Sequence, residues 1–175
     1  MVQKALELQL DFIAVTDHVG YAEGSCVSET IAKCQAETRL LCIPSTEQTT
    51  ATFHLLAIGI QSRFGAFQQP LVAQVEEIHR QGGLAIAAHP YDKTRNFTEN
   101  QLLHSGLDAM ECARGTREQN QQQWQLSEQY NIPCVYNSDA HKKDDLGKQY
   151  NVCSVPINTV ADLKAALIGK KCKMK

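Results

Sequence analysis

Histidines and carboxylates recur directly after short apolar runs in this sequence of 175 residues. The segment "YNSDAHKKDDLG" places Asp139 and His141 after the apolar run "IPCVY". The run "DFIAV" leads in the same way into "TDH", which contains Asp17 and His18, and "GLAIAA" leads into His89. Imidazole and carboxylate groups together suit zinc, manganese or iron. The pattern therefore indicates a metal site.

Three further residues extend this pattern. Glu47 follows the run "LLCIP", and we expect it in the next loop, while Glu111 lies near the end of the run "LDAMECA". His54 lies near the start of "FHLLAIGI", as expected if residues 47–54 form a hairpin-like connection. The set holds more ligands than one ion needs, which favours two or three ions. Paired ions about 3.5–4 Å apart are a common device for phosphoester hydrolysis.

Each of these residues has an ordinary explanation when it is taken alone. A histidine after a strand is commonly a loop residue, and an aspartate there commonly caps the next helix. His79 and His104 lie in helical stretches, and we interpret both as surface or packing residues. The convergence favours a site, because four of the six histidines occupy or adjoin strand ends and are accompanied by carboxylates.

The elements that would position these residues alternate along the chain. Apolar runs at 11–16, 40–44, 53–60, 83–88, 107–113, 132–137 and 150–156 are separated, in most cases, by helical patterns at 27–38, 70–81, 117–130 and 158–169. A further helix precedes the first run. This alternation predicts an α/β fold with a largely parallel sheet, open or closed into a barrel. The carboxyl ends of such strands gather at one edge, where active sites form.

Composition limits the remaining interpretations. The length predicts one domain over residues 1–175. The net charge of −2 gives no reason to expect bulk nucleic-acid or membrane binding, although nucleic acid stays open as a partner. No stretch approaches the roughly 20 apolar residues of a membrane span, and the N-terminus does not resemble a signal peptide. Seven cysteines without a CxxC pair indicate neither a disulfide framework nor a thiolate zinc site, so we expect a reducing cytoplasm.

Taken in order, five segments resemble the PHP (polymerase and histidinol phosphatase) superfamily: "AVTDH", "EQTTATFHLLAIGI", "GGLAIAAHP", "DAMECARG" and "SDAHKKDDLG". The resemblance implies a distorted (β/α)7 barrel with a trinuclear metal centre and, in most members, phosphoesterase activity. It implies Glu47 as a bridge between ions and Asp17 as a residue that orients a ligand. The implied metal ligands are His18, Glu47, His54, His89, Asp139 and His141.

One feature of the superfamily has no counterpart here. Its members normally open with a strand ending in an HxH motif, whereas this sequence resembles them only from the first helix onward. We therefore expect a barrel without its first strand and fewer than three divalent ions, whether Zn, Mn, Fe or Mg. Glu47, His54 and His89 would still provide three ligands to one ion. The free edge of the strand at 11–16 would favour a homo-oligomer.

Two functional hypotheses follow from the resemblance. The first is a metal-dependent phosphoesterase that cleaves a small phosphomonoester or a nucleotide-type substrate, with Asp17 and Glu111 as catalytic carboxylates. Candidate phosphate contacts are Arg114, Lys93 and Arg95, because guanidinium groups match phosphate oxygens, although a surface role fits these residues equally well. The alternative is a non-catalytic or degenerate module that binds one metal or none.

Overall fold

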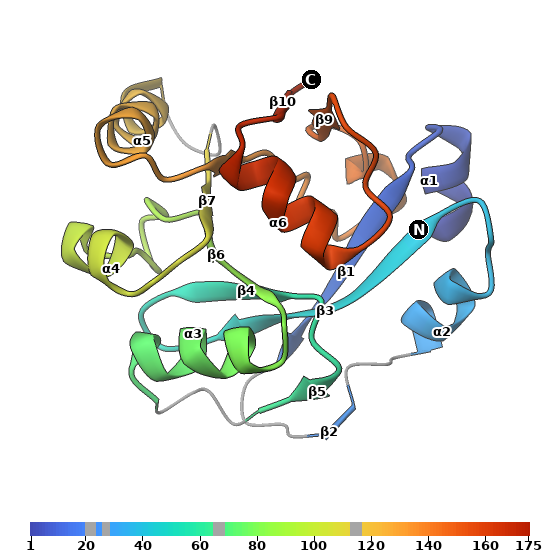
Figure 1. Cartoon of the computed structure of the whole chain (residues 1–175), viewed down its shortest axis with the longest axis horizontal. Helices are drawn as coiled ribbons and strands as arrows, with labels where there is room; N and C mark the ends of the chain where they lie inside the picture. The colour runs from blue at the N-terminus through green and yellow to red at the C-terminus, as the bar shows by residue number, and fades with distance from the viewer. Residues whose placement is uncertain (20–23, 26–28, 65–68, 113–116) are drawn as a thin grey trace.

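The computed structural model describes residues 1–19, 24–25, 29–64, 69–112 and 117–175, and it shows an α/β fold around a six-stranded sheet (Figure 1). The strand order is β1–β3–β4–β6–β7–β8. In chain order the strands are β1 Phe12–Val19, β3 Leu41–Thr49, β4 His54–Ile58, β6 Leu84–Ala88, β7 Ala109–Glu111 and β8 Cys134–Val135. The antiparallel β4 lies between β3 and β6, and the other neighbours pair in parallel. The predicted α/β class with a mostly parallel sheet is confirmed.

The sheet is open in the part of the chain that the structure describes. β1 and β8 are its two edge strands, and no pairing joins them. Two short sheets lie beside it, one formed by β2 Gly24–Ser25 with β5 Ser62–Arg63 and the other by β9 Asn151–Cys153 with β10 Cys172–Met174. The described strand pairings therefore do not form the closed barrel that the resemblance implies.

Helices cover the sheet and connect its strands. They are α1 Val2–Glu7, α2 Glu29–Gln35, α3 Leu71–Arg80, α4 Glu99–His104, α5 Arg117–Tyr130 and α6 Val160–Ile168, with a short 3-10 turn at Lys143–Asp145. Local signals fix several ends: Pro70 precedes α3, and the side chains of Thr98 and Thr159 cap α4 and α6.

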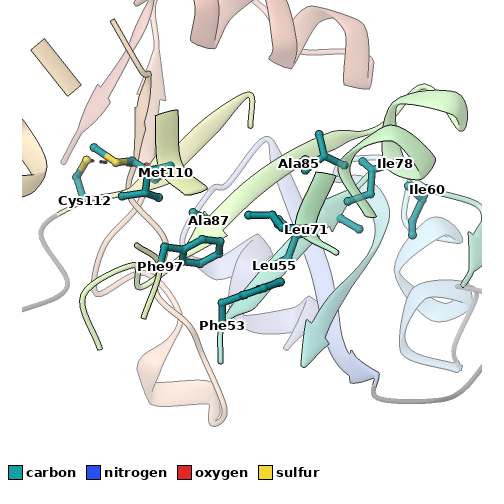
Figure 2. Packing of buried hydrophobic residues seen from close by; sticks show 13 residues of the cluster. Phe53, Leu55, Ile60, Leu71, Ile78, Ala85, Ala87, Phe97, Met110 and Cys112 are labelled. Atoms are coloured by element: carbon teal, nitrogen blue, oxygen red, sulfur yellow. Dashed lines mark hydrogen bonds between the residues drawn. The ribbon is translucent and has the colours of Figure 1, made fainter. Parts of the chain in front are cut away.

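Alternate residues of β4 contribute to two separate core clusters. Leu55 and Ala57 pack in the cluster that includes Leu71 and Ile78 of α3 (Figure 2). Leu56 and Ile58 point the other way, into the cluster that holds Leu163 and Leu167 of α6. Because side chains alternate along a strand, helices on both faces require apolar residues at every position from Leu55 to Ile58. This explains the continuous apolar run in the sequence.

Two strands are longer than the sequence indicates. β1 extends to Val19 and β3 to Thr49, so Asp17, His18 and Glu47 lie within strands and not past their ends. The expectation of Glu47 in a loop is wrong. The reason is the parallel ladder, which continues through the polar residues and pairs His18 with Glu47. The predicted hairpin-like connection is present, because β3 and β4 pair through Thr49 and His54.

Six of the seven cysteines form disulfides, which corrects the expectation that no disulfide framework is present. The pairs are Cys34–Cys42, Cys112–Cys134 and Cys153–Cys172, with Cα atoms 5.7, 5.5 and 3.9 Å apart. The pairs join segments that are neighbours in the fold, for example β9 with β10, so folding creates a proximity that sequence spacing does not reveal. None of the described helices has the length and apolar character needed to cross a membrane.

Candidate metal centre

His18, Glu47 and His54 present donor atoms that all lie within 4.8 Å of one another. Nδ1 of His54 lies 2.6 Å from Oε1 of Glu47, and Nδ1 of His18 lies 3.8 Å from Oε2 of the same carboxylate. The residues come from β1, β3 and β4, which are consecutive in the sheet. His18 pairs with Glu47 in the ladder, so adjacent strands place these two residues side by side.

His89 joins His18, Glu47 and His54, and these four residues form the inner group of the site. Nε2 of His89 lies 3.1 Å from Nδ1 of His54 and 3.5 Å from Oε1 of Glu47. Its Nδ1 is buried and has no hydrogen-bond partner in the described part of the chain. Donors that share a tetrahedral zinc ion with bonds of about 2.1 Å lie ~3.4 Å apart. The donor atoms of Glu47, His54 and His89 are spaced closely enough to share a divalent ion, as are those of His18, Glu47 and His54, and they are the right types.

Asp139 and His141 border the inner group from the segment after β8. The ring of His141 lies 5.9 Å from the ring of His18, and its Nδ1 lies 3.0 Å from the backbone oxygen of Asp139. The negative charge of Asp139 also acts on His89, raising the pKa of that imidazole. The structure therefore brings all six residues that the resemblance implies as ligands to the same region of the molecule.

The charges in this group shift two pKa values. Burial alone would raise the pKa of Glu47, but hydrogen bonds with His54 and His89 and the nearby His18 lower it from 4.5 to about 2. Burial alone would lower the pKa of His89, but its hydrogen bond with Glu47 and the charges of Glu111, Glu47 and Asp139 raise it above the ordinary value. Glu47 is thus an anion that attracts cations, whether protons on the imidazoles or a metal ion.

Glu111, one of the two predicted catalytic carboxylates, contacts the inner group through the backbone of His89. The buried side chain accepts a hydrogen bond of 2.6 Å from the backbone N–H of His89 and one of 2.9 Å from Nδ2 of Asn137. These contacts are those of a positioning residue. Asp17, the other predicted catalytic carboxylate, is exposed at the cavity wall, and no hydrogen bond or ion pair involves its side chain among the described residues.

The three predicted phosphate contacts differ in position. Nη1 of Arg95 lies 2.7 Å from Nε2 of His54 and donates to the backbone oxygen of Thr50 at 3.0 Å, so Arg95 is part of the site. Lys93 is exposed on the same loop. Arg114 lies outside the described residues.

Sequence reasoning missed two polar partners of the site. Oγ1 of Thr49 lies 2.9 Å from Nδ1 of His18, and Asn137 holds Glu111. Thr49 stands two positions after Glu47 on β3, so the twofold periodicity of a strand would have placed both on one face. Asn137 follows β8 without regular structure, and no periodic signal marks it.

A cavity of about 600 Å³ opens beside the group, between the edge strands β1 and β8. Its polar part is lined by Asp17, Glu47, His89, Glu111 and Asp139. Its apolar part is lined by side chains that include Leu56, Ile86, Val135 and Leu163. A mostly apolar hollow with a few convergent charged groups is the usual form of a small-molecule site.

Comparison with known proteins shows which proteins share this fold. Residues 117–172 match a family model described as PHP-associated. The fold matches a two-domain protein from Bacteroides vulgatus that contains a predicted PHP-like metal-dependent phosphoesterase, with a TM-score of 0.75 and 20% identity over 99% of this chain. This chain spans 58% of the length of that protein. No curated protein matches the sequence.

Two further crystal structures share the fold. PsfC from Pseudomonas syringae matches with a TM-score of 0.71 and 14% identity, over 99% of this chain and 80% of PsfC. A candidate metal-dependent phosphoesterase from Bifidobacterium adolescentis matches with a TM-score of 0.64 and 15% identity, over 95% of this chain and 88% of its own. The predicted resemblance to PHP proteins is therefore confirmed by the family model over residues 117–172 and by the fold over nearly the whole chain.

Proposed function

We propose that the chain is a metal-dependent hydrolase of phosphate esters, acting on a small phosphomonoester or a nucleotide-type substrate. The observation that carries this proposal is the convergence of donor atoms from His18, Glu47 and His54 within 4.8 Å, beside a cavity. The fold shared with PHP-like proteins supports it. We also propose that the open sheet corresponds to the distorted (β/α)7 barrel of these proteins.

The residues that would hold a divalent ion are His18, Glu47 and His54, with His89 at the same centre and Asp139 and His141 beside it. Glu47 brings a full negative charge, because its pKa is about 2. A bound ion would supply a nucleophile by lowering the pKa of a water, and it would neutralise charge on a phosphoryl oxygen. The candidate ions are zinc, manganese, iron and magnesium.

The other residues of the site would orient the ligands and the substrate. Glu111 fixes the backbone of His89, and Thr49 contacts His18, so two imidazoles have their positions set by neighbouring groups. The Arg95 guanidinium would contact phosphate oxygens from the loop after His89. Asp17 would exchange protons with the substrate, because this residue lines the cavity and its side chain makes no hydrogen bond or ion pair with the described residues.

A panel of phosphoesters tests the proposal. The protein is stripped of metal, reloaded with Mn²⁺, Zn²⁺ or Mg²⁺, and assayed for phosphate release, with metal per chain measured in parallel. We expect release that requires metal and is lost in Glu47→Gln but kept in His104→Ala, whose histidine is exposed on α4 outside the site. Bound metal without hydrolysis of any ester would instead support the non-catalytic module.

Two further expectations stay proposals. The free edge of β1 would allow pairing with another copy of the chain, which gives a homo-oligomer. A cytoplasmic location stays a prediction, and the three disulfides do not add support to it, because disulfides persist mainly in oxidising compartments.

A further inference from the structure

We infer that Arg95 and a metal ion compete for His54, so that metal binding releases the Arg95 guanidinium to bind a phosphate group. The inference rests on the proposed metal site and adds a coupling between that site and the substrate anion. It follows from one contact, the 2.7 Å approach of Nη1 of Arg95 to Nε2 of His54.

The contact defines where the proton of His54 resides. A guanidinium has N–H donors and no acceptor, so Nε2 of His54 must accept the hydrogen bond from Arg95. The single proton of the neutral imidazole is then on Nδ1. Nδ1 lies 2.6 Å from Oε1 of Glu47, a carboxylate oxygen that accepts it. Both sides of the ring therefore agree on one tautomer.

A metal ion cannot bind His54 while this arrangement persists. An ion on Nε2 would take the lone pair that Arg95 uses. An ion on Nδ1 would move the proton to Nε2. The N–H of Nε2 and the N–H of Arg95 would then face each other as two donors without an acceptor. Either route breaks the contact with Arg95, and neither changes the net charge of the imidazole.

Arg95 stays close to the site after its release. Oδ1 of Asp92 accepts from the backbone N–H groups of Thr94 and Arg95 and from the Thr94 hydroxyl, which fixes the loop. Nη1 of Arg95 also donates to the backbone oxygen of Thr50 at 3.0 Å, a contact that does not involve His54. No carboxylate pairs with this guanidinium in the described residues. Its positive charge and planar donors, beside a bound cation, are therefore available for a phosphate group.

Opposite effects on two ligands test the coupling. The affinity for Zn²⁺ is measured by competition with a chelating dye, and the affinity of the zinc-loaded protein for inorganic phosphate by calorimetry. Arg95→Met should bind zinc roughly tenfold more tightly, because the hydrogen bond to His54 exists only in the metal-free protein. Its zinc-loaded form should bind phosphate roughly tenfold more weakly, since a charged contact is lost. Arg80→Met, which removes a surface arginine paired with Glu77, should change neither affinity.

The position of the proton on His54 gives an independent readout. Nitrogen NMR of the metal-free wild type should show His54 protonated at Nδ1, and Arg95→Met should lose that preference. Unchanged or weaker zinc binding in Arg95→Met, unchanged phosphate binding, or a wild-type His54 protonated at Nε2 would each overturn the inference. If the opposite affinity changes occur but no phosphoester is hydrolysed, the coupling stands and the proposed activity fails. If hydrolysis occurs without these changes, the coupling alone fails.

Discussion

The backbone N–H of His89 donates a hydrogen bond of 2.6 Å to Oε2 of Glu111. His89 has a φ of 28°, in the left-handed region that a side chain other than glycine seldom adopts. A buried carboxylate therefore holds the backbone of a site histidine in an uncommon conformation. The other oxygen of Glu111 accepts from Asn137, so one side chain connects the end of β6 to the segment after β8.

Removing this carboxylate should weaken both the fold and the metal site. Glu111→Ala removes the acceptor of the His89 N–H and of the hydrogen bond from Nδ2 of Asn137, which should cost about 1–3 kcal/mol of unfolding free energy. Urea unfolding measures this loss, and metal analysis should show reduced occupancy. Glu111→Gln keeps an acceptor oxygen and should be milder. Equal stability of the alanine variant and the wild type would show that the two contacts are not made.

Replacing His89 should affect metal binding more than folding. His89→Ala removes one of the four inner donors, and we expect metal affinity to fall roughly tenfold or more, because even groups that only orient ligands contribute that much. Any phosphoesterase activity should disappear. Circular dichroism and a metal titration measure the two properties, with His104→Ala as the matched histidine control. Unchanged metal stoichiometry in His89→Ala would count against its role as a ligand.

The metal-free protein should lose stability as the pH rises past neutrality. The interactions of His89 with Glu47, Glu111 and Asp139 raise the folded-state pKa of this histidine above the ordinary 6.5. This stabilisation is fully present below pH 6.5 and is lost as the pH rises through the raised pKa. Unfolding in chelator between pH 6 and about 8.5 measures the slope. His89→Asn should flatten it, and an equally steep slope in that variant would exclude His89 as the source.

Metal affinity should change in the opposite direction over the same pH range. A metal ion must displace the proton from His89, so binding should strengthen as the pH rises. The pKa of Glu47 is about 2, so this carboxylate stays ionised over the whole range and does not alter the metal affinity. Metal titrations at several pH values measure this dependence, and a pH-independent affinity would contradict it.

Thiol counting tests the disulfides. With three disulfides among seven cysteines, the protein denatured without reductant should react with a thiol reagent at no more than one site per chain. The Cys112–Cys134 bridge closes a separation of 22 residues, so its loss in Cys134→Ser should cost roughly 3 kcal/mol. Seven reactive thiols would show that the bridges do not form.

Much of the fold could be predicted because its signals are local. The apolar runs and the helix between Pro70 and Gly82 come from periodicity and from start and stop residues, and the structure agrees with them. The ends of β1 and β3 could not be predicted, because polar residues remain in these strands only where the ladder between His18 and Glu47 continues. That pairing is a property of two distant segments and leaves no periodic signal in either one.

The site shows the same division. Residue type and position after apolar runs indicated His18, Glu47 and His89, and the resemblance added His54 from the start of its run. The structure brings nitrogen and oxygen atoms of these four residues together. The contact between Arg95 and His54 could not be predicted, because it depends on how the loop after His89 folds back over the β3–β4 turn. Such a side-chain contact depends on tertiary geometry, and it leaves no periodic signal in the sequence.

The β3–β4 hairpin has a consequence for the order in which the chain assembles. Glu47 and His54 lie on its two strands, and the hydroxyl of Thr50 closes the turn by donating to the backbone oxygen of Phe53. Contacts between residues so close in sequence close at low entropic cost and form early. The contacts of these two residues with His18 and His89 require much longer loops to close. In a newly made chain, Glu47 and His54 would therefore be able to bind a metal ion together before the rest of the sheet has formed.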